Sequence, residues 1–146
     1  MSRPLRIEDL IVWKLACEFE AGVLALLRAS PSAARDFKFA AQLGDSASSV
    51  AANIAEGFYR YNAGEFAQFL RYSRGSLAEA EKWLQTGVRK GYWQEDDLRT
   101  WFAIAARLGP ALRSLHNSLT AAAKRKKEER GGKGSEGGKG VSKVRE

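Results

Sequence analysis

Apolar residues recur at spacings of three and four along almost the whole chain up to about residue 119. This spacing places apolar side chains on one face of an α-helix, and no stretch alternates between apolar and polar residues as a half-buried strand does. The pattern therefore predicts an all-α protein. We expect four helices, at about 8–29, from 36 to about 60, from a turn at 62–64 to about 90, and from 94–96 to within 124–127.

Residues that start or stop helices separate these segments. The Ser-Pro pair at 30–31 ends the first helix, Asp36 suits the start of the second, and Gly91 stops the third. Short connections favour antiparallel neighbours, so we predict an up-down-up-down four-helix bundle. The Gly-Pro pair at 109–110 predicts a kink or a break in the last helix, because proline removes a backbone donor and crowds the preceding turn.

The first predicted helix carries two apolar stripes instead of one. One stripe can face the bundle, and the second widens the apolar arc beyond that of an ordinary surface helix. The second stripe then packs either in the core or against another subunit, and the sequence does not separate these alternatives. We take Val12, Phe19, Val23 and Leu26 as the candidate oligomer interface, beside a first stripe of Leu10, Trp13, Cys17, Leu24 and Leu27.

The second predicted helix combines a stripe of large apolar residues with small residues at most other positions. Alanine, glycine and serine at these positions allow a neighbouring helix to approach closely. The residues expected to face inward are Phe39, Leu43, Ala47, Val50, Ile54 and Phe58.

The formal net charge of +7 is unevenly distributed. Nine basic and four acidic residues lie at 124–146, which leaves 15 basic and 13 acidic residues for the rest of the chain. The same segment is rich in glycine and poor in apolar residues, so it cannot bury enough surface to offset its chain entropy. We therefore predict one domain at 1–123 and a basic, mostly disordered tail at 124–146.

The composition excludes several classes of protein. The longest apolar run, at 21–27, is far shorter than the roughly 18 residues that span a bilayer, and acidic Glu8 and Asp9 argue against a signal peptide. A single cysteine, Cys17, permits no internal disulfide, so we expect a cytosolic protein without membrane contact. The only histidine is His116, and Arg113 stands where a di-iron Glu-x-x-His motif needs glutamate. We expect no enzyme activity, no cofactor and no metal.

Polar side chains gather beside the apolar stripe around the turn between the second and third helices. Asn53, Glu56 and Arg60 follow at spacings of three and four, so they share one helix face. They either form a charge network between the two helices that contacts a ligand, or they only cap and staple the hairpin. The second interpretation is favoured. Residues of this motif are Asn53, Glu56, Gly57, Glu65 and Glu79.

A set of short segments between residues 7 and 119 carries a family resemblance. They are Glu8-Asp9-Leu10-Ile11-Val12-Trp13-Lys14, Gln42, Ser49-Val50-Ala51-Ala52-Asn53-Ile54-Ala55-Glu56-Gly57, Arg60, Glu65-Phe66, Phe69-Leu70, Gly75-Ser76, Glu79 and Gly91-Tyr92. As a set these segments are fairly specific for one protein family. The chain resembles the four-helix-bundle proteins encoded in intervening sequences of bacterial 23S ribosomal RNA genes.

The resemblance implies a small helical bundle that assembles into a ring-like homopentamer without catalytic activity. The family is similar to the accessory variability determinant of diversity-generating retroelements, which is pentameric, binds nucleic acid and partners a reverse transcriptase. This chain departs from that accessory protein in its opening and central motifs. Its basic tail is not a feature that the resemblance explains.

Our leading hypothesis is a non-catalytic homo-oligomer that binds structured RNA, or a complex of nucleic acid with a reverse transcriptase, through phosphate charges. The alternative is a structural protein-interaction subunit without nucleic-acid contact, which the near-neutral charge of residues 1–123 favours. The candidate nucleic-acid contacts are Arg60, Arg71, Arg74, Arg89, Lys90, Lys124, Arg125, Lys126, Lys127 and Arg130.

Overall fold

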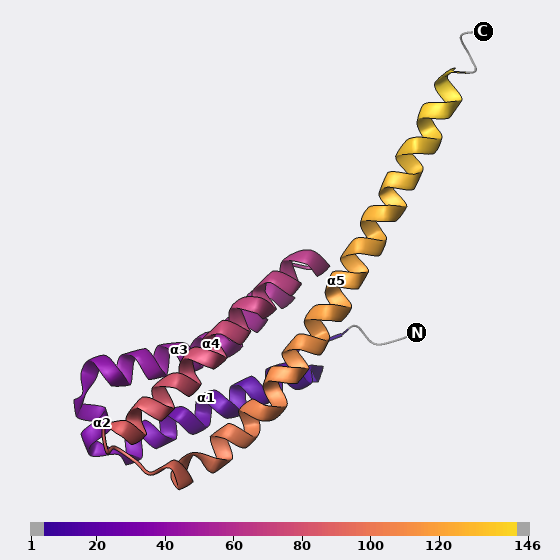
Figure 1. The fold of residues 1–146 in the computed structure, drawn as a ribbon. Helices are drawn as coiled ribbons and strands as arrows, with labels where there is room; N and C mark the ends of the chain where they lie inside the picture. The colour runs from indigo at the N-terminus through magenta and orange to yellow at the C-terminus, as the bar shows by residue number, and fades with distance from the viewer. Residues whose placement is uncertain (1–4, 143–146) are drawn as a thin grey trace.

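The structure is a computed structural model that describes residues 5–142, with side chains described as far as Gly132. Four long helices pack antiparallel, and no strand occurs within residues 5–142 (Figure 1). The all-α class and the up-down-up-down order are as predicted. The elements are η1 Ile7–Asp9, α1 Ile11–Ala29, α2 Pro31–Arg35, α3 Phe37–Phe58, α4 Ala63–Arg89, η2 Glu95–Leu98 and α5 Arg99–Ser142.

The helix ends follow the capping signals in the sequence. Asp36 caps α3, since its Oδ1 accepts a hydrogen bond from the backbone N–H of Phe39 at 3.2 Å. Asn62 caps α4 in the same way, through the backbone N–H of Glu65 at 2.9 Å. Gly91, at φ +78°, follows the last residues of α4 in the left-handed conformation that glycine adopts without strain.

The second apolar stripe of α1 faces the core of the single chain. Val12, Phe19 and Val23 are at most 2% exposed, and Leu26 is half-buried. Val12, Phe19 and Val23 are therefore core residues, which corrects their assignment to an oligomer interface, while that of Leu26 stays a prediction. The wide apolar arc of α1 has a different cause, because α1 packs against both α3 and α5 and is covered from two sides.

Helices α3 and α4 form the closest pair, and their small residues explain this. A Cβ atom at Gly57 would lie 2.7 Å from the Cβ of Phe69, so only glycine fits there without displacement. The hydroxyl of Ser73 donates a buried hydrogen bond to the carbonyl of Val50 at 2.8 Å across the pair. The predicted inward residues of α3 are buried, apart from the half-buried Phe58.

Helix α5 is continuous through Pro110, so of the predicted kink or break the break does not occur. Leu108 and Leu112, on either side of the proline, are both fully buried in the core. The burial of these two side chains keeps the helix continuous, although proline removes one backbone hydrogen bond.

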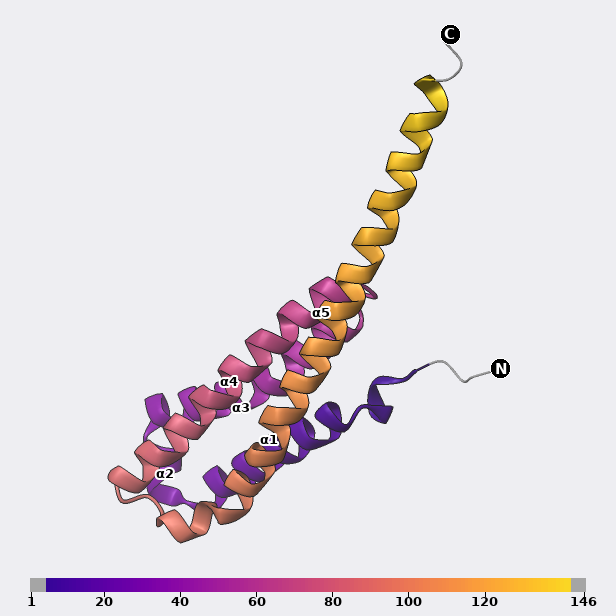
Figure 2. The ribbon, with the colours of Figure 1, turned by 45° about the vertical axis from the view of Figure 1, so that its right-hand side comes forward.

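The same helix extends past the bundle and projects away from it as far as Ser142 (Figures 1 and 2). Residues 124–130 are all Lys, Arg or Glu, which are good helix formers, and they continue a helix that is already nucleated. Residues 124–132 are nevertheless all exposed, as their composition predicts. The end of the tail, at 143–146, lies outside the described residues.

Candidate nucleic-acid interface

The face of α5 that packs on the bundle changes from apolar to basic where the bundle ends. Along the core, this face carries leucines at three- and four-residue spacing, and Ala123 is its last apolar position. Because residues at i+3, i+4 and i+7 share a helix face, the next positions of the stripe are Lys126, Lys127 and Arg130. The leucines of the stripe are Leu108, Leu112, Leu115 and Leu119.

These three cations lie over the turn between α3 and α4. A Cβ atom at Gly64 would lie 3.9 Å from the Cβ of Ala123, so the first turn of α4 approaches α5 closely at this point. Figures 1 and 2 show the α3–α4 turn beside α5 in both views. The two elements enclose a cavity of about 210 Å³, lined by Asn62, Ala63, Gly64, Ala123, Lys126, Lys127 and Arg130.

The acidic residues of this part of α5 lie on other sides of the helix. At about 100° per residue, Glu128 and Glu129 point away from the face of Ala123, together with Lys124 and Arg125. The cavity lining therefore contains three cations and no carboxylate among the described residues. Of the five predicted basic residues in this segment, the structure brings three together and separates two.

Two exposed tyrosines precede the cavity at the α3–α4 turn. Tyr59 is 56% and Tyr61 is 84% exposed. Tyr61 adopts φ +53°, in the left-handed region that residues other than glycine and asparagine rarely occupy. The rings of Tyr59 and Tyr61 meet edge-on at 6.4 Å, and Tyr59 meets Phe58 in the same way at 5.0 Å.

Sequence reasoning missed these tyrosines. The signal that was available is the run Phe58-Tyr59-Arg60-Tyr61 directly before the helix-capping Asn62. Aromatic residues in a turn cannot all be buried by the helices that the turn connects. We define the open end of the bundle as residues 59–64 of the turn together with residues 123–130 of α5.

Arg60 contacts residues of the α3–α4 hairpin to which it belongs. Its guanidinium bonds Glu56 at 2.7 Å, lies 3.7 Å from Glu65, and sits 5.1 Å from the centre of the Phe69 ring. This supports the interpretation that the polar motif staples the α3–α4 hairpin, and it leaves the charge of Arg60 balanced.

Other members of the polar motif do not join this network. The Asn53 amide donates within α3 to the carbonyl of Ser49 at 2.8 Å. Glu79 accepts from the Trp83 indole at 3.5 Å within α4. The charge network between the helices is therefore smaller than the spacing predicts.

The remaining basic candidates are spread along α4. This helix has 27 residues, so it is about 40 Å long, and Arg89 and Lys90 lie at the end opposite Arg60. Arg71 and Arg74 lie between these two ends, and neither makes an ion pair within the described part of the chain. The predicted core contacts do not form a single patch.

Lys90 belongs to a cluster that closes the opposite end of the bundle. Its ammonium donates to Oδ2 of Asp36 at 2.8 Å, and the Tyr92 hydroxyl donates to the same oxygen. These two hydrogen bonds lower the pKa of Asp36 from 3.8 to about 2, and the bond from Lys90 has the larger effect. The buried rings of Phe39 and Trp93 pack beside them. We define the closed end as Asp36, Phe39, Lys90, Tyr92 and Trp93.

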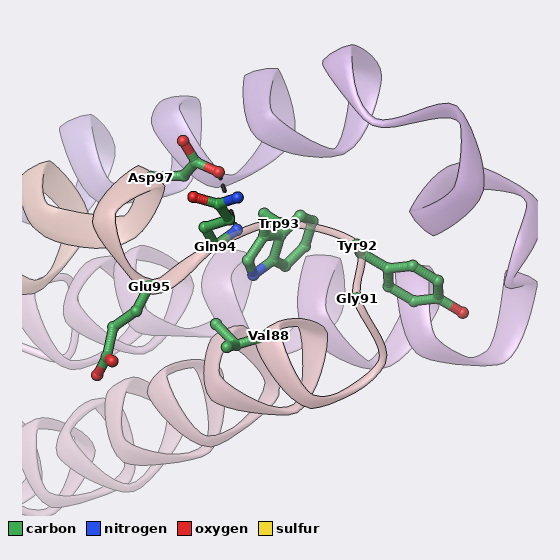
Figure 3. Close-up of a pocket in the computed structure, with 7 residues that line it drawn as sticks. All are labelled: Val88, Gly91, Tyr92, Trp93, Gln94, Glu95 and Asp97. Atoms are coloured by element: carbon green, nitrogen blue, oxygen red, sulfur yellow. Dashed lines mark hydrogen bonds between the residues drawn. The ribbon is translucent and has the colours of Figure 1, made fainter.

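A second hollow, of about 800 Å³, lies next to the closed end (Figure 3). Figure 3 shows the Tyr92 ring pointing away from Gln94 and Asp97, while the Trp93 indole donates to the carbonyl of Leu84 at 2.9 Å. Glu95 and Asp97 are the charged residues of its lining, which includes no cation. The hollow is therefore unsuited to a phosphate.

The single cysteine and histidine do not form a joint site. Cys17 is half-buried, and burial, followed by the charge of Glu20, raises the pKa of its thiol, so the thiol is not activated as a nucleophile. His116 lies 3.3 Å from the amide oxygen of its neighbour Asn117. Within the described residues, no three His, Cys, Asp or Glu side chains gather as a metal site, and none of the helices there combines the length and the apolar character needed to cross a membrane.

Comparisons with known proteins agree with this fold. A family model described as "23S rRNA-intervening sequence protein" matches residues 8–114. A crystal structure from Bacteroides thetaiotaomicron, described as a protein with unknown function from the S23 ribosomal protein family, superposes with a TM-score of 0.56 at 20% identity. The match covers 78% of this chain and 99% of that one. The comparison with curated proteins gives no match.

Proposed function

The chain belongs to the 23S rRNA-intervening sequence protein family, and we propose that it is a non-catalytic module that binds structured RNA through its open end. The observation that carries this proposal is the cavity between the α3–α4 turn and α5. Its lining presents Lys126, Lys127 and Arg130 without a carboxylate, and the α3–α4 turn that forms its other wall also carries the exposed Tyr59 and Tyr61. Structured RNA offers the matching chemistry, since it combines a dense row of phosphates with bases.

Phosphate binding suits these three side chains. Arg130 has a planar group that can bond two phosphate oxygens at once, and the lysines act as mobile point charges. All three lie on the exposed part of α5, so they can adjust to the ligand without disturbing the core. By contrast, Arg60 and Lys90 are bonded to carboxylates and contribute less net charge to a ligand.

We further propose that the protein works as a homo-oligomer, a pentamer by its family resemblance. A shallow groove of about 330 Å³ between α1 and α5 supplies apolar surface for this, with Ile11 52% exposed at its edge. It takes the place of the interface expected from Phe19 and Val23, which are buried, and it includes Val12 of the same stripe. An oligomer presents several open ends to one RNA, so weak individual contacts would add up to tight binding. The groove is lined by Leu10, Ile11, Val12, Ala111, Ser114, Leu115 and Ser118.

The first test compares two double variants that remove the same charge from the same helix. Lys126→Ala with Lys127→Ala removes cations from the cavity, whereas Lys124→Ala with Arg125→Ala removes them from the other sides of α5. Binding of a structured RNA is measured by fluorescence anisotropy at two salt concentrations. Each lost phosphate contact should reduce the slope of log affinity against log salt by about 0.7–0.9.

We expect the cavity variant to bind more weakly with a lower salt slope, and the control variant to stay close to the parent. A chain ending at Ala123 should behave like the cavity variant or worse. A flat salt dependence of the full chain would contradict the proposal, as would equal losses in the two double variants.

A second candidate function, a structural subunit that binds protein and not RNA, is favoured by the apolar groove. Under either function, Ile11→Glu should lower the mass of the oligomer in light scattering, with helical content unchanged. The functions separate on co-purification without nuclease. Recovery of a stable protein partner without nucleic acid favours the structural subunit, and a reverse transcriptase recovered together with RNA favours the RNA-binding function.

A further inference from the structure

We infer that the open end selects RNA with unpaired nucleotides, by stacking a base on the ring of Tyr61 while Lys126, Lys127 and Arg130 bind the neighbouring phosphates. The inference rests on the proposed function, because it specifies which kind of RNA the same surface recognises. It is carried by the conformation and exposure of Tyr61 and by the position of this residue next to the cation cavity.

Tyr61 is placed unfavourably for stability. Its backbone adopts the left-handed conformation, at φ +53°. For a tyrosine this conformation lowers the stability of the fold, whereas asparagine or glycine tolerates it. At 84% exposure the ring also gains little from burial, and its ring contact is an edge-on approach to Tyr59, which is itself exposed. A strained, exposed aromatic residue in a turn that folding alone would fill differently indicates a role in binding.

The position of the ring fits a nucleotide. Tyr61 directly precedes Asn62, which lines the cavity together with the three cations. The backbone of Tyr61 and the cations therefore lie at the same corner of the bundle, where the α3–α4 turn meets α5. Aromatic rings with adjacent cations are the usual means by which proteins hold single-stranded nucleic acid, because every base offers a flat face.

A paired helix would not use this arrangement. Bases within A-form RNA are stacked on one another, and their deep major groove excludes side chains, so an aromatic ring reaches only bases that are splayed out in loops, bulges or ends. A regular duplex could still contact the cations through its phosphates. The inference thus predicts a preference for RNA with loops over fully paired RNA of equal charge.

The test uses the full chain with two RNA probes, a hairpin with an unpaired loop and a duplex with the same number of phosphates. Three variants are compared with the parent by fluorescence anisotropy. Tyr61→Leu keeps an apolar side chain but removes the aromatic face, Tyr61→Phe keeps the face, and Tyr72→Leu removes a tyrosine that is 50% exposed on α4. Circular dichroism and thermal unfolding establish that each variant is folded.

We expect the parent to prefer the hairpin and Tyr61→Leu to lose roughly 5- to 150-fold in hairpin affinity, the range reported for one stacked base. Its affinity for the duplex should stay within about twofold, and Tyr61→Phe and Tyr72→Leu should both resemble the parent. If Tyr61→Leu is poorly folded, Tyr61→Asn, which suits the left-handed conformation, takes its place with the same expectation.

The outcomes separate the inference from the proposed function. If the Tyr61 variants bind both probes like the parent while removal of Lys126 and Lys127 weakens binding, stacking is refuted and phosphate recognition stands. Equal losses for Tyr61→Leu and Tyr72→Leu also overturn the inference. If neither RNA binds the full chain but a protein partner is lost in the Tyr61 variants, the proposed function fails and the ring belongs to a protein interface.

Discussion

The two ends of the bundle use the same types of residue for opposite purposes. At the closed end, Lys90 and the Tyr92 hydroxyl both bond Asp36, and neighbouring aromatic rings are buried. At the open end, Lys126 and Lys127 line a cavity without a carboxylate, and the tyrosines project into solvent. About 40 Å of helix α4 separates the two ends.

This difference shows that a cation or an aromatic residue is informative only together with its partners. A lysine whose ammonium is bonded to a carboxylate stabilises a fold. A lysine beside other cations makes the local electrostatic potential more positive, and this favours binding of an anion. The same holds for aromatic rings, which stabilise the core when buried and offer a contact surface when exposed. The closed end is therefore structural, and the open end is available for recognition.

The largest expected effect comes from breaking the closed end at Phe39. This residue is 2% exposed and its ring meets those of Trp83, Tyr92 and Trp93 at 5.1–6.1 Å. Phe39→Ala should lower the free energy of unfolding by about 3–5 kcal/mol, because it leaves a cavity among these rings. Urea unfolding followed by circular dichroism measures the loss.

A matched control lies two residues earlier. Phe37 is 82% exposed, so Phe37→Ala should change the free energy of unfolding by less than about 0.5 kcal/mol. The folded fraction of either variant should retain its affinity for RNA. Two results would contradict the assignment of structure to the closed end and recognition to the open end. One is an equal loss in the free energy of unfolding for the two alanine variants, and the other is loss of RNA binding by folded Phe39→Ala.

A smaller effect is expected from Asp36→Asn, which keeps the helix cap but removes the charge that holds Lys90 and Tyr92. The folded pKa of Asp36, about 2, lies below its ordinary value of 3.8. The unfolded chain therefore binds the proton more readily, so this contribution to stability is present above about pH 4 and is lost as pH falls through about 2. The variant should be less stable at neutral pH and should show a flatter stability profile across this acid range.

The alkaline side offers a second test of the same cluster. The hydrogen bond to Asp36 raises the pKa of Lys90 above 10.5 and that of Tyr92 above 10.0. Their contribution is thus present below about pH 10 and is lost as pH rises through the raised values. Thermal unfolding across both ranges compares the parent with Asp36→Asn. Identical profiles would mean that the cluster does not hold the closed end.

The sequence was sufficient for the bundle and for its boundaries, because these depend on local signals. Apolar spacing fixed the helices, and Asp36 and Gly91 marked their ends. One expectation about α5, a break at Pro110, failed because core packing and the lost backbone hydrogen bond oppose each other there. Packing of Leu108 and Leu112 outweighs the break at Pro110, and the helix propensity of 124–130 extends α5 beyond the residues it can bury.

The site was harder to predict because it depends on which side chains meet across the fold. The spacing of Lys126, Lys127 and Arg130 is visible in the sequence, but the turn beneath them is more than sixty residues away along the chain. The stripe with Val12 and Phe19 was ambiguous for the same reason, since an apolar face does not say whether a helix of the same chain or a second copy covers it.

The smallest expected change in stability, with the opposite sign, is at Tyr61 in the open end. Tyr61→Asn should raise the free energy of unfolding by about 0.5 kcal/mol, because asparagine tolerates the left-handed conformation and little buried surface is lost. Tyr72 lies within α4, so Tyr72→Asn should lower the free energy of unfolding by a similar amount, since asparagine is a poor helix former. Paired urea titrations distinguish these signs. Stabilisation together with weaker binding of the loop RNA would mean that the open end retains a residue at a cost to the fold, as binding surfaces do. Destabilisation by Tyr61→Asn would instead make Tyr61 part of the structure, and the two ends would then differ only in charge.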